Sequence, residues 1–182
     1  DQDKIDAIND GFLAASYDNH IIAGGRLSFE YNGQQLKKRK NVFYTSTAIE
    51  GAGNVLRGIY KYSNQLIDTT TNSYSLFGIR FAQFVKINLD TRYYRILSKK
   101  TKVVYRVAAG LGLPLSNLSE ALPFQKSFFS GGANGMRAWK ARTLGPGAYY
   151  DSTGSFDKIG DIQLESNIEF RFPLISWVEG AL

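Results

Sequence analysis

Cysteine is absent from the 182-residue chain, and histidine and methionine occur once each. The lack of cysteine excludes disulfide frameworks and thiolate metal sites. It does not identify a compartment, because oxidising compartments permit disulfides without requiring them. Apolar runs stay well short of the about 18 residues that indicate a transmembrane helix, which excludes helical spans. The chain begins without the basic residues and apolar core of a signal peptide, so we expect any leader to lie outside this sequence.

The single histidine, His20, restricts the enzyme classes that the chain could support. A Ser–His–acid triad would require it, yet no GxSxG nucleophile motif is present. A metal site would need further histidines or carboxylates at fixed spacing, and the sequence shows neither pattern. We expect His20 to be a turn or membrane-interface residue, and we expect no enzymatic activity, no catalytic residue, no metal and no cofactor.

The formal net charge of +6 could indicate a nucleic acid or anionic lipid as partner. Most of the excess lies in residues 37–40 and in Lys99, Lys100 and Lys102. No helix-turn-helix, zinc or base-stacking pattern accompanies these residues. We therefore interpret them as solvated turns and strand ends, and we expect no nucleic-acid partner.

Alternation of apolar and polar residues with a period of two runs through almost the whole chain. In residues 161–172, for example, Ile162, Leu164 and Ile168 alternate with charged and amide side chains. Such alternation predicts β-strands. Strands are predicted at residues 21–32, 41–53, 85–97, 101–113 and 161–172, with a sixth at residues 11–18. The fold class is therefore predicted to be all-β and antiparallel.

The length and charge of these strands favour a membrane barrel, although a soluble sheet with one wet face would also alternate. The runs are about twelve residues long, against five or six in typical soluble strands. This length is close to that of a tilted membrane crossing. The polar face is strongly ionic, and the water-filled lumen of a transmembrane β-barrel would hydrate it while the apolar face meets lipid.

Connection lengths alternate between short and long along the chain. Residues 33–40, 98–100 and 173–176 are short connections, whereas residues 55–82 and 114–160 are long ones. Short periplasmic turns and long external loops are typical of outer-membrane barrels. Residues 55–65 are predicted to form a short helix, and residues 177–182 to begin another outward strand. Because a barrel needs at least about eight strands, we expect the chain to be a barrel fragment of about six.

The second long connection carries features that a polar external loop would not need. Phe128 and Phe129 precede glycines that allow the backbone to turn back on itself. Arg137 stands between Met136 and Trp139, which suits a partly buried, bidentate ion pair. If the loop folds into the lumen, Glu165 and Glu169 on the following strand are the predicted partners of Arg137.

These residues resemble the outer-membrane assembly barrels of the BamA/TamA surface-antigen superfamily. The resemblance is carried by Phe129-Ser130-Gly131-Gly132, Met136-Arg137-Ala138-Trp139, Leu144-Gly145-Pro146-Gly147 and residues 160–173. The second group is similar to the Val-Arg-Gly-Phe/Tyr signature of the family's sixth external loop. Here Met, Ala and Trp replace the Val, Gly and Phe/Tyr of that signature, and this form of the motif looks like that of the TamL-like branch of Bacteroidetes. Residues 83–182 carry the resemblance well, and the first eighty residues share only the strand rhythm.

The resemblance implies that residues 1–182 are part of one C-terminal barrel domain of sixteen strands. The N-terminal periplasmic POTRA domains and the last strands would then lie outside this sequence. It also implies a lumen-inserted loop with the lock motif Gly131, Gly132, Met136, Arg137, Ala138 and Trp139. The family's arginine commonly packs on an Asp of strand thirteen, which would lie beyond Leu182.

The function implied is assembly, insertion or translocation of proteins at the bacterial outer membrane, without a nucleotide. The expected partners are outer-membrane lipids, unfolded outer-membrane or secreted client proteins, and subunits of an assembly complex. The alternative is a passive outer-membrane pore or solute transporter. A charged lumen containing Lys86, Asp90, Arg92 and Arg106 would suit that alternative equally well.

Overall fold

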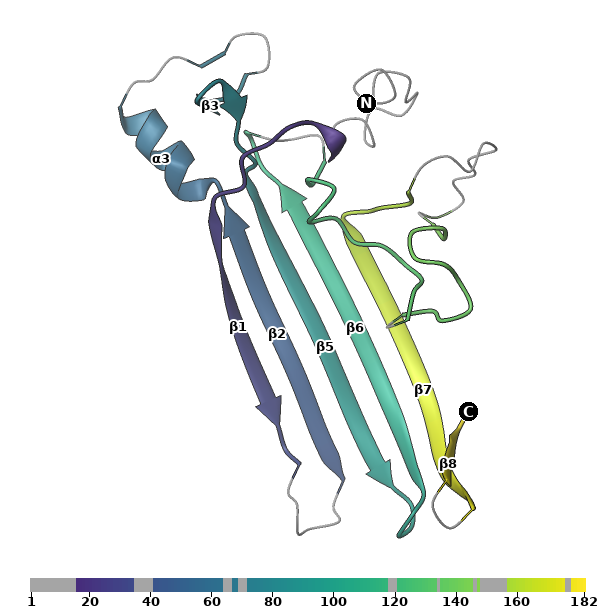
Figure 1. The fold of residues 1–182 in the computed structure, drawn as a ribbon. Coiled ribbons are helices and arrows are strands. Elements are labelled where there is room, and N and C mark those ends of the chain that lie inside the picture. The colour runs from purple at the N-terminus through teal and green to yellow at the C-terminus, as the bar shows by residue number, and fades with distance from the viewer. Residues whose placement is uncertain are drawn as a thin grey trace.

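The computed structural model describes residues 16–34, 41–63, 67–68, 72–117, 121–133, 135–145, 147, 157–175 and 178–182. Its main element is one six-stranded sheet in the order β1-β2-β5-β6-β7-β8, in which every neighbouring pair is antiparallel (Figure 1). The strands are β1 (Gly24–Asn32), β2 (Val42–Ala52), β5 (Phe84–Ile96), β6 (Lys102–Pro114), β7 (Ile162–Ile175) and β8 (Val178–Ala181). The predicted antiparallel β-fold is confirmed.

Smaller elements lie in the first long connection, at the end of the sheet where the long loop also starts (Figure 1). The helix α3 (Asn54–Tyr62) follows β2 directly and confirms the helix predicted there. The strands β3 (Ser75–Leu76) and β4 (Ile79–Arg80) form a separate hairpin. Within the described residues, no helix is long and apolar enough to cross a membrane.

The strand registers give the sheet one polar and one apolar face. On the polar face, Arg26 lies opposite Glu50, which lies opposite Lys86. On the apolar face, one row across five strands consists of Leu27, Ile49, Ile87, Leu111 and Ile162. The alternation predicted from the sequence is thus confirmed, because a single register places each set of side chains on one side.

The apolar face is open, and the buried core lies elsewhere. Ile162, Leu164 and Ile168 on β7 are between 72% and 78% exposed. The core cluster consists of Ala52, Ala82, Phe84 and Leu122, with Ile22 packed against it. It therefore forms where the long connections meet the end of the sheet. A large exposed apolar surface of this kind indicates contact with a membrane or another apolar partner.

The N-terminal part of the chain departs from the predicted strands. β1 begins at Gly24, not at residue 21, because Ile21 forms a parallel bridge with Phe81 in the first connection. Backbone bonds from Ile21 to Arg80 (3.1 Å) and from Ala82 to Ile21 (2.9 Å) hold that crossing. Of the predicted strand at residues 11–18, the first five residues lie outside the described range. Residues 16–17 form a helical turn, so that prediction is wrong where it can be compared.

The seventh strand, β7, is longer than predicted. β7 continues through Pro173 to Ile175, so the predicted turn at residues 173–176 is wrong for its first three residues. A register shift between Pro173 and Ile175 accommodates the proline, which cannot donate to the sheet. β8 confirms the strand predicted at the end of the chain. The basic residues 37–40 lie outside the described range, while Lys99 and Lys100 are exposed in the turn between β5 and β6.

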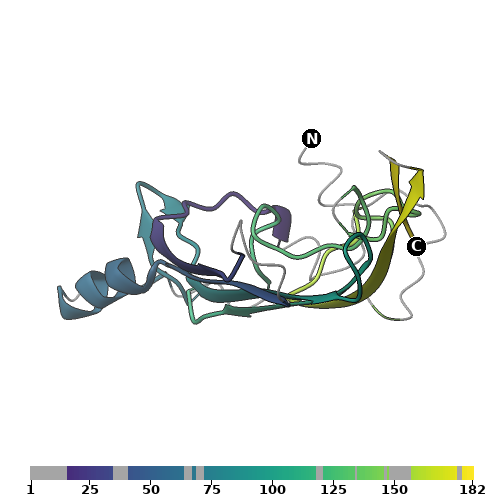
Figure 2. The same ribbon diagram turned by 90° about the horizontal axis from the view of Figure 1, so that it is seen from below.

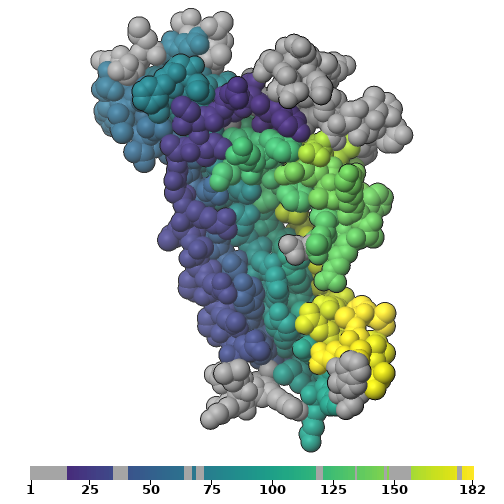
Figure 3. All heavy atoms as spheres, in the orientation of Figure 1, coloured from purple at the N-terminus to yellow at the C-terminus, as the bar shows by residue number. Residues whose placement is uncertain are grey.

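Seen from below, the sheet is a single curved layer (Figure 2). The second long connection and the segment at residues 16–23 lie on one side of this layer, whereas α3 projects beyond it (Figure 2). The space-filling view shows the loop covering the upper part of β6 and β7 and leaving the lower part of the face open (Figure 3). The fold therefore concentrates its irregular segments at one end and on one face.

Candidate functional site: the loop on the polar face

Two glycines on the polar face of β6 form the platform on which the loop packs. A Cβ atom on Gly110 would lie 2.3 Å from Cε1 of Phe128, and one on Gly112 would lie 2.2 Å from Cδ1 of Leu122. Both apolar side chains are buried. The loop can approach the strand this closely only because glycine leaves room for it. The loop thus packs on the polar face of the sheet, and its predicted insertion into a lumen stays a prediction.

A pair of lysines ties the start of the loop to the sheet. Lys126 on the loop forms a salt bridge with Glu50 of β2. Lys86 of β5 donates to the backbone carbonyl of Lys126, and its Nζ lies 3.9 Å from the ring centroid of Phe128. Polar side chains of two strands thus hold the loop. The contact between the Lys86 ammonium and the Phe128 ring adds to the stabilisation that comes from burying that ring.

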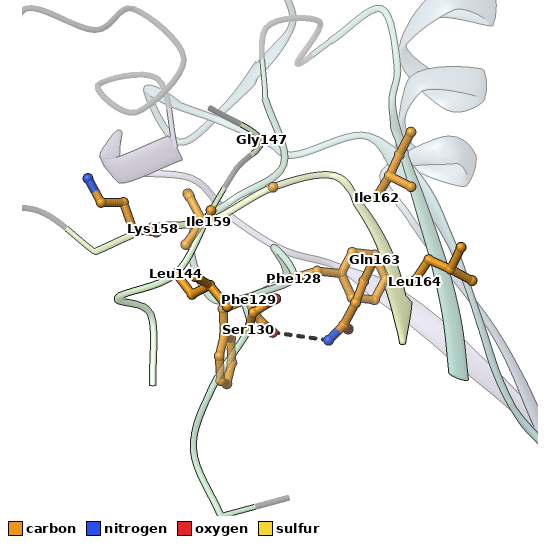
Figure 4. Close-up of a pocket in the computed structure, with 12 residues that line it drawn as sticks. Phe128, Phe129, Ser130, Leu144, Gly147, Lys158, Ile159, Ile162, Gln163 and Leu164 are labelled. Atoms are coloured by element: carbon orange, nitrogen blue, oxygen red, sulfur yellow. Dashed lines mark hydrogen bonds between the residues drawn. The ribbon is translucent and has the colours of Figure 1, made fainter. Parts of the chain in front are cut away.

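The returning part of the loop is attached to Phe128 and Phe129 by backbone and side-chain hydrogen bonds. Phe128 and Gly160 exchange two backbone bonds of 2.8 and 2.9 Å. The Gln163 side-chain amide donates to the Phe129 carbonyl at 3.1 Å. In Figure 4, Gln163 points toward the loop, whereas Ile162 and Leu164 point away from it. Phe128, Phe129 and Gln163 are among the residues that line a cavity of about 230 Å³ between the loop and β7.

The predicted lock motif forms a compact turn at the tip of the loop. Gly131 and Gly132 have φ angles of 89° and 88°, which favour glycine. A Cβ on Gly131 would lie 2.5 Å from the Lys140 carbonyl oxygen. Backbone bonds from Gly132 to Trp139 (2.9 Å) and from Trp139 to Met136 (3.0 Å) close the turn. The two glycines are therefore required by the backbone of the turn itself.

The rest of the motif is exposed above the polar face. Met136 is 47% and Trp139 48% exposed, and Arg137 and Ala138 are exposed as well. Arg137 lines a cavity of about 560 Å³ on the polar face, into which the sheet also contributes arginines. Those arginines are Arg92, Arg106 and Arg171. The tip thus brings a fourth guanidinium to a cavity that Glu169 also lines.

Glu165 and Glu169, the predicted partners of Arg137, have nearer partners on the sheet. Arg106 Nη1 lies 3.0 Å from Glu165 Oε1, and Arg171 Nη2 lies 2.8 Å from Glu169 Oε2. In the described part of the chain, Arg137 forms no direct ion pair with either carboxylate. It interacts electrostatically with Glu169 and shares its cavity. The difference arises because arginines on the same sheet face reach these carboxylates first, and a direct pair with Arg137 stays a prediction.

An ionic network below the tip joins three strands. The Asp90 carboxylate accepts hydrogen bonds from Arg92 (2.9 and 3.1 Å) and from Arg106 (3.0 and 2.8 Å). Arg106 continues the network to Glu165 on β7. All four side chains are partly buried, so solvent screens these pairs less than fully exposed ones. The network fixes the polar face beneath the loop.

Arg142 is an anchor of the loop that sequence reasoning missed. Its guanidinium carbon lies 4.5 Å from the ring centroid of Phe124 and 4.7 Å from that of Phe129. Asp157 lies 3.9 Å away, and the ring of Tyr17 stacks on Phe124 at 4.6 Å. No spacing in the sequence links these residues, because the loop brings them together only when folded. The nearest signal was the aromatic content of the loop.

Asn117 connects the two long connections through a buried network. Its side-chain amide donates to the carbonyls of Tyr74 (3.0 Å) and Phe81 (2.8 Å), and its oxygen accepts from the Tyr74 amide (2.6 Å). The backbone N–H of Asn117 donates to Gln83 Oε1 at 3.1 Å. Asn117 is only 1% exposed. Every one of these bonds therefore replaces contact with water.

Asp161 lies between the loop and β7 with its carboxyl partly buried. Burial raises the pKa of Asp161, while a hydrogen bond from the Leu122 backbone and the charge of Lys86 oppose that rise. One carboxyl oxygen is buried and has no hydrogen-bond partner among the described residues. The charged form of Asp161 is thus an unfavourable element of the folded loop.

Replacing Asp161 with asparagine is expected to stabilise the protein at neutral pH. A carboxyl whose folded-state pKa is raised favours the protonated form. The wild type therefore loses stability as the pH rises from its ordinary pKa of about 4 through the raised value. Asparagine does not titrate, so its advantage should be largest near pH 7 and disappear below about pH 4. Thermal unfolding midpoints of both proteins across this pH range test the prediction, and parallel profiles would contradict it.

His20 lies outside the loop, with its Nε2 3.5 Å from an Arg80 nitrogen. Arg80 also pairs with Asp18 at 3.2 Å. His20 thus lies in the segment that crosses the end of the sheet. Among the residues that the structure describes, no group of three or more His, Cys, Asp or Glu side chains could hold a metal ion.

The amino-acid sequence of the chain was compared with models of known protein families and with curated proteins. The family model of the Omp85 superfamily domain matches residues 62–182, about two thirds of the chain. No curated protein gives a significant match. The matched range contains β5 to β8 and the whole loop, whereas β1 and β2 precede it.

Proposed function

The chain belongs to the Omp85 superfamily, and from this membership we propose that it is part of a BamA/TamA-type protein-assembly barrel. The superfamily serves protein insertion and translocation at the outer membrane of Gram-negative bacteria. In the proposal, the barrel has sixteen strands, belongs to the TamL-like branch and acts without a nucleotide. Unfolded outer-membrane or secreted proteins are its clients, and further subunits attach to the full-length protein.

The observation that carries the proposal is the long loop anchored to the polar face of a sheet whose other face is apolar. A closed barrel would place the polar face around a wet lumen and the apolar face against outer-membrane lipid. In a sixteen-stranded barrel, further strands would also pair with the outer edges of β1 and β8, which stand at the two ends of the described sheet. The loop would then occupy the lumen, held by Lys126 and Phe128.

A passive pore is the alternative, and the cavity of about 560 Å³, which is lined by charged side chains of both signs, favours it as a path for solutes. The anchored loop argues against it, because a loop packed on Gly110 and Gly112 narrows the space that solutes would cross. The sequence upstream of the chain discriminates between the two functions. POTRA repeats there would support assembly, whereas a plug domain would support transport.

Arg137 is proposed to link the loop tip to the barrel wall. It interacts electrostatically with Glu169 and stands among groups of four strands, β5, β6, β7 and β8, in one cavity. A charge in this position can hold the tip over the wall without burying the side chain. The tip would then respond to changes in the arrangement of these four strands.

Replacing Arg137 with alanine in the full-length protein is expected to leave the barrel inserted but to slow client assembly about fivefold. That factor corresponds to about 1 kcal/mol, the upper range for an interaction between exposed charges. Folding of a client barrel into vesicles that contain the variant measures the rate. Heat-modifiable migration of the variant itself reports insertion.

Lys140→Ala is the matched control, because Lys140 is an exposed cation of the same tip that does not line the large cavity. It should assemble clients at the wild-type rate. An Arg137→Ala protein with both normal client assembly and normal protease resistance of the loop would refute the role of Arg137.

A further inference from the structure

The helix α3 packs through one side and leaves a second apolar side open. Tyr60 faces the protein, with its ring 5.7 Å from the ring of Tyr74 and 5.9 Å from that of Phe81. Val55, Ile59 and Tyr62, which are spaced four and three residues apart, are 76%, 56% and 93% exposed. At this spacing the three side chains form one stripe along the helix. α3 therefore carries an apolar stripe that remains exposed when the helix packs against the protein.

α3 lies at the end of the sheet and follows closely on the apolar side chains of β2. α3 starts two residues after β2 ends, and Gly53 between them has a φ of 71° that redirects the chain. A Cβ on Gly53 would lie 2.3 Å from the Ala82 carbonyl oxygen, so glycine is required there. In Figure 2, α3 projects beyond the sheet and away from the loop on the polar face. Ile49, on the apolar face of β2, is 49% exposed just before this point.

The charges of α3 complement an anionic surface. The helix contains no acidic residue, and Lys61 in its last turn is exposed. Arg57 is half-buried with its guanidinium 5.7 Å from the Tyr74 ring. At about 100° per residue, both cations lie on a side of the helix different from the Val55–Ile59–Tyr62 stripe. Apolar residues on one side and lysine on another are typical of helices that lie in a membrane interface.

We propose that α3 is an interfacial helix that lies in the lipid headgroup region at the external rim of the barrel. Val55, Ile59 and Tyr62 enter the boundary between headgroups and acyl chains, and Lys61 meets lipid phosphates. The ligand of this surface is thus the lipid surface itself. The inference rests on the proposed function, since it requires the apolar face of the sheet to contact lipid.

Fluorescence quenching by nitroxide lipids tests the position of α3 in the full-length protein. Single cysteines replace Ile59, Tyr62, Leu164 and Lys140 in a protein without other cysteines, and each carries the same environment-sensitive label. The vesicles contain phosphatidylcholine, phosphatidylglycerol and a lipid with the nitroxide near the headgroup or at the chain end. Leu164, on the apolar face, is the lipid-facing reference, and Lys140, on the loop tip, is the water-facing reference.

Labels at Ile59 and Tyr62 should be quenched at least about twofold more than the label at Lys140, and more by the headgroup nitroxide than by the chain-end one. Quenching at Leu164 with none at Ile59 or Tyr62 would overturn the interfacial helix and leave the barrel orientation intact. Absence of quenching at Leu164 as well would overturn the proposed lipid contact of the sheet. Lys61→Glu should reduce quenching at Ile59 only when phosphatidylglycerol is present, and unchanged quenching would refute the phosphate contact.

Discussion

Replacing Gly110 with valine is expected to release the loop from the polar face and to make it roughly 10- to 100-fold more sensitive to trypsin. The new side chain would occupy the space of the Phe128 ring, whose atoms lie 2.3 and 2.4 Å from the position of a Cβ. The ring has little freedom to move, because Phe128 is 7% exposed and its backbone is bonded to Gly160. Overpacking of this kind costs about 1–3 kcal/mol, which sets the expected increase in opening.

Trypsin is a suitable probe because Arg137, Lys140 and Arg142 lie on the loop itself. The sheet should remain intact, since valine favours strands more than glycine does. Gly25→Val is the matched control, because a Cβ on Gly25 meets nothing within 4 Å. A loop that is cleaved at the wild-type rate in Gly110→Val would show that the glycine platform does not hold it.

A second substitution at Phe128 isolates the contact with Gly110. Phe128→Ala alone should loosen the loop by removing a buried ring and its contact with Lys86. In the Gly110→Val background, the same substitution should restore part of the protease resistance, because the clash is removed. Additive effects of the two substitutions would indicate that Gly110 acts on the loop in another way.

Replacing Asn117 with leucine is expected to destabilise the end of the sheet by about 3–5 kcal/mol. Leucine has a similar volume but leaves three backbone groups, two on Tyr74 and one on Phe81, without their partner. Each buried polar group that loses its hydrogen bond costs about 1–3 kcal/mol. Part of that cost is recovered where water reaches the site, which lowers the expected total.

Hydrogen exchange measures this effect where it is expected to arise. Amides of residues 72–83 should lose protection by a factor of about 100 or more, while those in the middle of β5 and β6 should change little. Asn32→Leu is the control, because Asn32 is exposed and accepts a single bond from Gln34. Equal protection in the Asn117 and Asn32 variants would contradict a structural role of the buried network.

The two loop arginines have different surroundings in the structure. Arg142, which carried no prediction, is held between the rings of Phe124 and Phe129. Arg137, which carried the main prediction, is exposed and lines the large cavity. Arg142 thus contributes to the anchoring of the loop, which leaves Arg137 available for the proposed link to the wall. This division explains why Arg137→Ala is expected to affect assembly more than barrel stability.

Strand positions and faces could be read from the sequence because a period of two leaves no ambiguity about which side chains share a face. β2, β5 and β6 therefore begin and end within one residue of the predicted ranges. The N-terminal prediction failed at Ile21, where alternation continues but the backbone pairs with Phe81 instead of β2. Periodicity records the environment of side chains and does not identify the segment that a backbone pairs with.

The sequence by itself determined that the sheet has an ionic and an apolar face and that a glycine-rich loop follows β6. It could not determine which side chains anchor that loop. Glu165 was matched with Arg137 by position, but Arg106 lies 3.0 Å from it on the neighbouring strand. Strand register brings together residues about sixty positions apart, and a loop folded back on a sheet adds contacts that follow no period. Only the tertiary structure therefore decided the partners of each charge, because ion pairs depend on distances in space rather than on spacing along the chain.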